Sequence, residues 1–200
     1  MIDFVEFPKM ARLSREVIVT EKIDGTNGCI QIDEDGNMYV GSRTRWITPE
    51  NDNHGFARWA FDHAEELKKG LGTGRHFGEW WGSGIQRGYG LPKGEKRFSL
   101  FNTIRWCLHD EEPKRIETED PRIEKYQQRL PTCCHLVPVL WRGIFNTEII
   151  DNQLNLLEEL GSLASLGFKP AEGVVIFHVA GNVLFKKTIG KDGHKTLKEV

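Results

Sequence analysis

The stretch Val17-Ile18-Val19-Thr20-Glu21-Lys22-Ile23-Asp24-Gly25-Thr26-Asn27-Gly28 contains the first strand of the fold and the turn that ends it. The β-branched residues over 17–20 predict a strand, because such side chains fit a pleated, half-buried surface. Asp24-Gly25 predicts a turn, and the residues from 28 to 32 predict a second strand. The chain therefore begins with two consecutive strands that are joined by a short charged turn.

The strand pattern continues outward from this stretch. Asp33-Glu34-Asp35-Gly36-Asn37 predicts a hairpin turn before a strand over 38–42, since Asp-Gly and Gly-Asn tolerate positive φ. The acidic segment 110–121 contains proline and predicts a surface loop. Further strands are predicted over 76–81, 98–106, 173–179 and 182–189, of which the last two form a hairpin around Ala180-Gly181.

Two segments have apolar residues at helical spacing. The first covers 56–69 and is ended by Gly70. The second covers 148–166, with Asn146 or Thr147 as its cap, and its apolar face consists of Ile149, Leu154, Leu157 and Leu160. Strands outnumber helices and are joined mostly by hairpins, so the sequence predicts an α+β fold with antiparallel sheets.

The composition is that of a folded globular protein. The 200 residues are 38% hydrophobic and 28% charged, which predicts a packed core rather than disorder. One domain over residues 1–200 is expected at this length. No apolar run approaches the length of a membrane span, and the first residues lack a secretory signal. We therefore expect a monomeric, cytoplasmic protein that does not bind membranes.

Neither the net charge nor the cysteines identify a ligand. The formal charge of -2 gives no sign of nucleic acid, so a nucleic-acid protein of this composition must concentrate its cations on one face. The basic segment 75–97 is a candidate for that face, although a solvated surface explains it equally well. A metal site could combine Cys107 and His109 with Cys133, Cys134 and His135, but paired C-x-x-C spacing is absent and buried or incidental cysteines are favoured.

Lys22 is the candidate nucleophile. A lysine amine attacks phosphorus only when it is neutral, and Lys22 lies where a strand meets a turn. Asp24, two residues later, could orient the amine or hold metal-bound water. The tetrapeptide Lys22-Ile23-Asp24-Gly25 is common by chance, so by itself it equally describes a strand-end lysine beside a turn aspartate.

Six short segments in a fixed order give Lys22 its context. They are Lys22-Ile23-Asp24-Gly25-Thr26-Asn27, Ser42-Arg43-Thr44-Arg45, Phe77-Gly78-Glu79-Trp80-Trp81-Gly82, Phe98-Ser99-Leu100-Phe101-Asn102, Glu172-Gly173-Val174-Val175-Ile176 and Leu184-Phe185-Lys186-Lys187-Thr188. This series resembles the signature segments of the covalent nucleotidyltransferases, which include ATP-dependent DNA ligases, RNA ligases and capping guanylyltransferases. The segments that contain Thr26-Asn27, Arg43 and Phe101 most resemble the RNA ligases that seal duplex nicks, including RNA-editing ligases.

The resemblance implies both a fold and an activity. The fold is α+β, with two antiparallel β-sheets and flanking helices, the ATP-grasp-like nucleotidyltransferase domain of ligases, here as a single adenylation domain over 1–200 without a C-terminal oligonucleotide-binding domain. The activity is that of an ATP-dependent RNA ligase, which joins 5′-phosphate and 3′-hydroxyl ends through a lysyl-AMP and an adenylated 5′-end. The implied cofactors are ATP and Mg²⁺ or Mn²⁺, and the implied partners are RNA ends or a nicked duplex, with DNA also open.

The resemblance also implies a role for each matching residue. Lys22, Asp24 and Lys186 are the catalytic set, and Glu172 is the metal ligand. ATP is bound by Lys22 and Lys186 together with Glu21, Ile23, Asn27, Arg43, Glu79, Phe101, Glu172 and Lys187, with Glu79 at the ribose and Phe101 stacked on adenine. Nucleic acid is bound by Arg43, Arg45, Gln86, Arg87 and Lys93. Lys186 is favoured over its neighbour Lys187, because adjacent strand residues point to opposite faces.

The sequence leaves several other functions open. A minimal ATP-dependent DNA ligase or a capping guanylyltransferase core would contain the same segments. A non-catalytic nucleic-acid-binding module of the same fold is a further alternative, although such a module would be expected to lose Lys22, Glu79 or Glu172. An unrelated α+β domain would have to match six ordered segments by coincidence.

Overall fold

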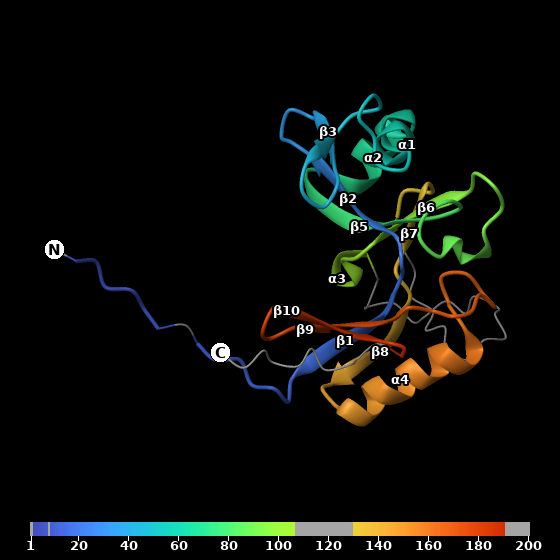
Figure 1. Ribbon diagram of the computed structural model, residues 1–200. Helices are drawn as coiled ribbons and strands as arrows, with labels where there is room; N and C mark the ends of the chain where they lie inside the picture. Colours follow the sequence, from blue (N-terminus) through green and yellow to red (C-terminus); the bar gives the residue numbers. More distant parts are fainter. Residues whose placement is uncertain (1, 8, 107–129, 191–200) are drawn as a thin grey trace, which may run out of the picture.

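The computed structural model describes residues 2–7, 9–106 and 130–190. These residues form two β-sheets, four α-helices and one short 3-10 helix (Figure 1). The fold is α+β, as the sequence predicts. The predicted loop over 110–121 and the possible metal ligands Cys107 and His109 lie outside the described residues. Among the described residues, no helix has the length and apolar character needed to span a bilayer.

The four-stranded sheet contains the first strand and the last two, in the order β10-β9-β1-β8, and every neighbouring pair is antiparallel. Its strands are β1 (Glu16–Lys22), β8 (Val139–Ile144), β9 (Gly173–His178) and β10 (Val183–Thr188). Helix α4 (Thr147–Leu160) covers one face, where Val17, Val19, Val174, Ile176 and Leu157 form a core. The opposite face contains Lys22 and turns toward the second sheet.

Helix α4 begins as predicted but ends early. The side chain of Asn146 accepts hydrogen bonds from the backbone N–H groups of Glu148 and Ile149, so the predicted cap is confirmed. The predicted end near 166 is wrong, because Gly161 has φ 87° and ends the helix after Leu160. Leu160 is 47% exposed instead of inward, and the buried position near the start is Ile150 rather than Ile149.

The six-stranded sheet has the order β4-β3-β2-β5-β6-β7. Its strands are β2 (Thr26–Ile32), β3 (Met38–Gly41), β4 (Trp46–Ile47), β5 (Gly74–Gly82), β6 (Lys96–Leu100) and β7 (Cys134–Leu136). All neighbours are antiparallel except β6 and β7, which are parallel, so the expectation of purely antiparallel sheets is wrong for this pair. The predicted strand over 98–106 also ends early, because Asn102 accepts a hydrogen bond from the Arg105 N–H and begins helix α3 (Thr103–Trp106).

Two helices cover the face of the six-stranded sheet that lies away from the four-stranded sheet. They are α1 (Phe56–Asp62) and α2 (Ala64–Leu71), where the sequence predicts one helix over 56–69. The helix breaks at His63, whose φ of -108° is not helical. The ring of Phe56 packs directly on Gly28, where a Cβ atom would lie only 2.7 Å from it. Glycine at this strand position therefore lets the helix approach the sheet closely.

Two chain segments cross from one sheet to the other side by side. Residues 23–25 lead from β1 into β2, and residues 137–138 lead from β7 into β8 (Figure 1). The backbone N–H of Glu21 donates to the carbonyl oxygen of Pro138 over 2.9 Å, which ties the two crossings together. Ile23 and Val137 are buried against Trp81 and Tyr89 in a small core between the sheets.

Candidate active site

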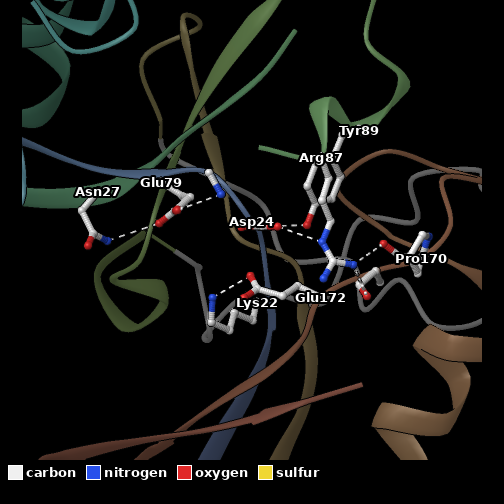
Figure 2. A network of polar contacts seen from close by, with 10 residues as sticks. Lys22, Asp24, Asn27, Glu79, Arg87, Tyr89, Pro170 and Glu172 are labelled. Atoms are coloured by element: carbon white, nitrogen blue, oxygen red, sulfur yellow. Dashed lines mark hydrogen bonds and ion pairs between the residues drawn. The ribbon is translucent and has the colours of Figure 1, made fainter. Parts of the chain in front are cut away.

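Lys22 is the last residue of β1 and lies at the crossing between the sheets (Figure 2). Its Nζ atom is 2.6 Å from Oε2 of Glu172, and both side chains are largely buried, at 23% and 16% exposed. The two residues meet because Lys22 pairs with Gly173, the first residue of β9, so Glu172 directly precedes the paired position. The first and fifth of the six segments are thus brought into direct contact, although 150 residues separate them.

Glu79 is the second carboxylate at this site and comes from the middle of β5. Its Oε1 accepts the backbone N–H of Gly25 over 3.0 Å, and its Oε2 accepts from Nδ2 of Asn27 over 3.3 Å. Burial raises the pKa of Glu79 from 4.5 to about 7, and the nearby carboxylates of Glu172 and Asp24 act in the same direction. Lys22 and the Gly25 N–H act against this rise without cancelling it. Glu79 is therefore partly protonated near neutral pH.

Asp24 does not contact the Lys22 amine. Its Oδ2 accepts from Nε of Arg87 over 2.8 Å, and its backbone N–H donates to the hydroxyl oxygen of Tyr89 over 2.8 Å. Nη1 of Arg87 also donates to the carbonyl oxygens of Pro170 and Ala171, over 3.0 and 3.2 Å (Figure 2). Arg87 thus connects the turn after Lys22 to the segment that leads into Glu172, and a role in binding nucleic acid stays a prediction.

Glu21 points to the opposite face from Lys22, as neighbouring strand residues do. It is 1% exposed, and its carboxylate accepts from Oγ of Ser162 over 2.6 Å and from the backbone N–H groups of Leu163 and Ala164 over 2.8 and 3.0 Å. Its side chain therefore holds the segment after α4 against β1. The predicted contact of Glu21 with ATP stays a prediction, and its carboxylate is engaged elsewhere.

The two adjacent lysines of β10 lie on different faces of the four-stranded sheet. Lys186 pairs with Val175, which pairs with Thr20, so Lys186 shares the face that contains Lys22. Lys187 points to the helical face, where its Nζ forms an ion pair with Asp151 of α4. The predicted division between these residues agrees with this geometry, although their roles at phosphate stay predictions.

The remaining predicted residues lie in several segments around this cluster. Phe101 follows β6, is partly exposed and lies on the Glu79 side of the sheet, because it is two residues from Ser99, the partner of Glu79. Ile23 is buried beside Lys22. The exposed residues lie in three connecting segments: Arg43 and Arg45 between β3 and β4, Gln86 before the 3-10 helix at Gly88–Gly90, and Lys93 after it.

The carboxylates present fit a divalent cation only with help from a ligand. Among the residues that the structure describes, no group of three or more His, Cys, Asp or Glu side chains could hold a metal by itself. Mg²⁺ is usually bound by one or two carboxylates together with substrate phosphates and water. Glu172, with its hard oxygen donors directly at Lys22, satisfies that requirement once a polyphosphate is present.

Sequence reasoning misses one residue that shapes the site and assigns a second one a different role. Tyr89 is fully buried, and its hydroxyl oxygen fixes the turn at Asp24. Arg87 is noticed only as a possible phosphate ligand, whereas the structure pairs it with Asp24. The flanking glycines of Tyr89 indicate an unusual backbone, and its φ is 51°, but nothing local in the sequence indicates a partner more than sixty residues earlier.

Comparisons with known proteins identify the family and the fold. The family profile described as RNA ligase matches residues 15–191, so the chain belongs to the RNA ligase family. A search of curated proteins found no significant match. Among solved structures, the fold matches variants of Naegleria gruberi RNA ligase: one with AMP and Mn at 19% identity and a TM-score of 0.54, and one with ATP and Mn at 17% identity and a TM-score of 0.56.

These structural matches define the fold and its extent. They cover 88% and 89% of this chain but only 50% and 51% of the Naegleria chains, so the chain spans about half the length of those ligases. At such low identity the likeness establishes a shared fold. The two-sheet architecture is shared with these ligases, and the six segments lie within the residues 15–191 that the family profile matches.

Proposed function

We propose that this chain is the nucleotidyltransferase domain of an ATP-dependent RNA ligase, and that Lys22 is its nucleophile. The observation that supports this most strongly is the position of the Lys22 amine. It lies largely buried between two sheets, 2.6 Å from Glu172, with Glu79 and Asp24 close enough to influence one another electrostatically. Membership of the RNA ligase family supports the same reaction class.

The first proposed step transfers AMP to the protein. The neutral amine of Lys22 attacks the α-phosphorus of ATP, a P–N bond forms, the bond to the β-phosphate oxygen breaks, and pyrophosphate leaves. Lys22 must first lose one proton to solvent and leave its ion pair with Glu172. A divalent cation held by Glu172 would compete for that carboxylate and so favour the neutral amine.

The surrounding residues would bind the nucleotide and its developing charge. Lys186 lies on the same sheet face as Lys22, so its ammonium can stabilise the α-phosphate more strongly in the transition state than in the ground state. Glu79 is suited to accept a hydrogen bond from the ribose, and Phe101 to stack on adenine. A divalent cation at Glu172 would neutralise phosphate charge. Arg87 would keep Asp24 and the turn in place.

The later proposed steps join the ends. AMP passes from Lys22 to the 5′-phosphate of a strand: the P–N bond breaks as a new pyrophosphate bond forms. A 3′-hydroxyl oxygen then attacks the activated 5′-phosphorus, and AMP leaves with its own phosphate as a phosphodiester is made. RNA ends are the proposed substrates on the basis of family membership.

Covalent labelling tests the proposal directly. Wild-type protein incubated with α-labelled ATP and Mg²⁺ should retain label after denaturation, and Lys22→Ala should retain none. Lys69→Ala, an exposed lysine on α2, is the matched control and should label like the wild type. Labelled GTP tests for a guanylyltransferase, and nicked RNA, DNA and hybrid duplexes test the choice of strand. A wild-type protein that stays unlabelled with every nucleotide would exclude the proposed chemistry.

A further inference from the structure

The outer half of the six-stranded sheet has an uncovered face with aromatic side chains on it. Helices α1 and α2 lie on the opposite face, and the small core at Trp81 covers only the inner end, near the second sheet (Figure 1). Tyr39, Trp46 and Phe77 are 46%, 53% and 52% exposed. We call this surface the aromatic face and define it by four residues, namely Tyr39, Trp46, Arg75 and Phe77.

Strand register places the aromatic side chains on one side of the sheet. Gly41 of β3 pairs with Trp46 on one side and with Cys29 on the other, and Cys29 pairs with Phe77. Partners in antiparallel pairs point to the same side. Trp46 and Phe77 therefore lie on the same face of the sheet, at the same level.

Tyr39 and Arg75 form a second row of the aromatic face, two residues along their strands from Gly41 and Phe77. Gln31 of β2 pairs with Tyr39 and with Arg75, which places these two side chains on the face that Cys29 also occupies. Nε of Arg75 donates to Oε1 of Gln31 over 3.0 Å, which holds the guanidinium against the sheet. This is the face that contains Glu79 further along β5, so the aromatic face and the candidate active site are continuous.

Contacts within the aromatic face fix its rings in place. The indole of Trp46 lies on the bare backbone of Gly41, where a Cβ atom would be 3.2 Å from it. The Trp46 and Tyr39 ring centroids are 6.0 Å apart, and the guanidinium carbon of Arg75 is 5.9 Å from the Trp46 centroid. A preordered set of rings loses little conformational entropy when a flat ligand stacks on it.

Three arginines lie on or beside the aromatic face, and an acidic turn lies at its far boundary. Arg75 belongs to the face, and Arg43 and Arg45 lie in the exposed segment between β3 and β4 that borders it. The acidic hairpin turn at 33–35 forms the far boundary, where Asp33 accepts a hydrogen bond from the Tyr39 hydroxyl. Cations beside exposed rings are the combination that binds the phosphates and unstacked bases of single-stranded nucleic acid.

We propose that the aromatic face binds unpaired RNA bases next to the end that is to be joined. Phe77 connects the face to the site, because its carbonyl oxygen accepts the N–H of Phe101 over 3.0 Å. A bound single strand would therefore run from Trp46 across Phe77 toward Phe101 and Glu79. The bases of a duplex are already stacked on one another, so the face favours single strands over blunt duplexes. The choice of RNA rests on the proposed function.

Binding of a labelled oligonucleotide tests this inference. The probe is a 5′-phosphorylated single-stranded RNA of about ten nucleotides, compared by fluorescence anisotropy with a blunt duplex of the same sequence. Loss of one stacking ring should weaken binding of the single strand about 5- to 150-fold in Trp46→Ala and leave the duplex nearly unaffected. Trp46→Leu keeps apolar volume over Gly41 without a stackable ring, so it should show the same loss with less effect on folding.

Two controls separate this inference from the proposed function. Phe61→Ala removes an exposed ring from α1 on the opposite side of the sheet and should bind like the wild type. Trp46→Leu should still become labelled by α-labelled ATP, because Trp46 takes no part in the proposed transfer. A wild-type protein that does not label, but binds the single strand and loses that binding in Trp46→Leu, would refute the proposed function and leave the aromatic face supported.

Several outcomes would overturn the inference. Equal binding of the single strand by wild type and Trp46→Leu would do so, as would an equal loss for single strand and duplex, which would indicate phosphate contacts alone. A wild-type protein that does not bind the single strand would also overturn the inference. A dimer that Trp46→Leu dissociates, with RNA binding unchanged, would assign the face to a second copy of the chain instead.

Discussion

Glu79 should make the folded protein less stable as the pH rises. Its pKa is about 7 in the folded protein and close to 4.5 in an unfolded chain, chiefly because the carboxylate is buried. Below the lower value both states are protonated and Glu79 has no effect on the free energy of unfolding. Between the two values the unfolded chain releases its proton first, so the folded state loses stability. Above about pH 7 the full cost, about 3 kcal/mol, has been reached.

Replacement of Glu79 by glutamine removes this pH-dependent cost and keeps the size of the side chain. The amide oxygen can still accept the Gly25 N–H, and Asn27 can turn its own amide to match. Between about pH 5 and about pH 8 the wild type should therefore lose about 2 to 3 kcal/mol more stability than Glu79→Gln. Every other titrating group is common to both proteins, so the difference between them isolates Glu79.

Urea unfolding followed by tryptophan fluorescence, without nucleotide, measures this difference at several pH values. Glu65→Gln removes an exposed carboxylate from α2 and serves as the control for loss of one negative charge. The reasoning is refuted if the stabilities of wild type and Glu79→Gln stay parallel over this range. It is also refuted if the wild type gains stability relative to the variant as the pH rises.

Three further predictions concern side chains around Lys22. Lys186→Ala should slow labelling by ATP at least about tenfold, whereas Lys187→Ala should slow it much less. The reason is that only Lys186 shares the sheet face of Lys22. Equal effects of the two substitutions in quenched-flow labelling would contradict the assigned faces. Glu21→Ala should lower the free energy of unfolding by about 3 kcal/mol, since it leaves one buried and two partly buried donors without their acceptor. A change below about 1 kcal/mol in urea unfolding would disprove this. Arg87→Lys should keep the charge near Asp24 but lose the hydrogen bonds to two carbonyl oxygens. Labelling should therefore slow about tenfold at saturating ATP. An unchanged rate would show that the position of Asp24 does not depend on these hydrogen bonds.

Local sequence was sufficient for most of the strands and insufficient for several ends. The β-branched residues at 17–20 and the Asp-Gly turn at 35–36 act on their own neighbours, and the structure has strands and a turn there. The break at His63 and the short helix after Asn102 depend on single side chains that compete with the regular pattern. The parallel pairing of β6 with β7 joins segments more than thirty residues apart, which no short-range pattern specifies.

The same distinction holds for the candidate site. Lys22, Glu79 and Glu172 could be proposed from the sequence because each lies in a short segment that resembles a known family. The separation of Lys186 from Lys187 followed from strand alternation, a local rule. The bond between Arg87 and Asp24 and the burial of Glu21 against Ser162 could not be anticipated, because each joins segments that only the folded topology brings together.

The two chain crossings have a mechanical consequence for Lys22. Residues 23–25 and 137–138 lie next to each other and are tied by the hydrogen bond from Glu21 to Pro138. If the two sheets tilt apart to admit a nucleotide or release one, these connections form the hinge about which they rotate. Points close to a rotation axis move least. The Lys22 amine, next to these connections, would therefore move little in such a rotation.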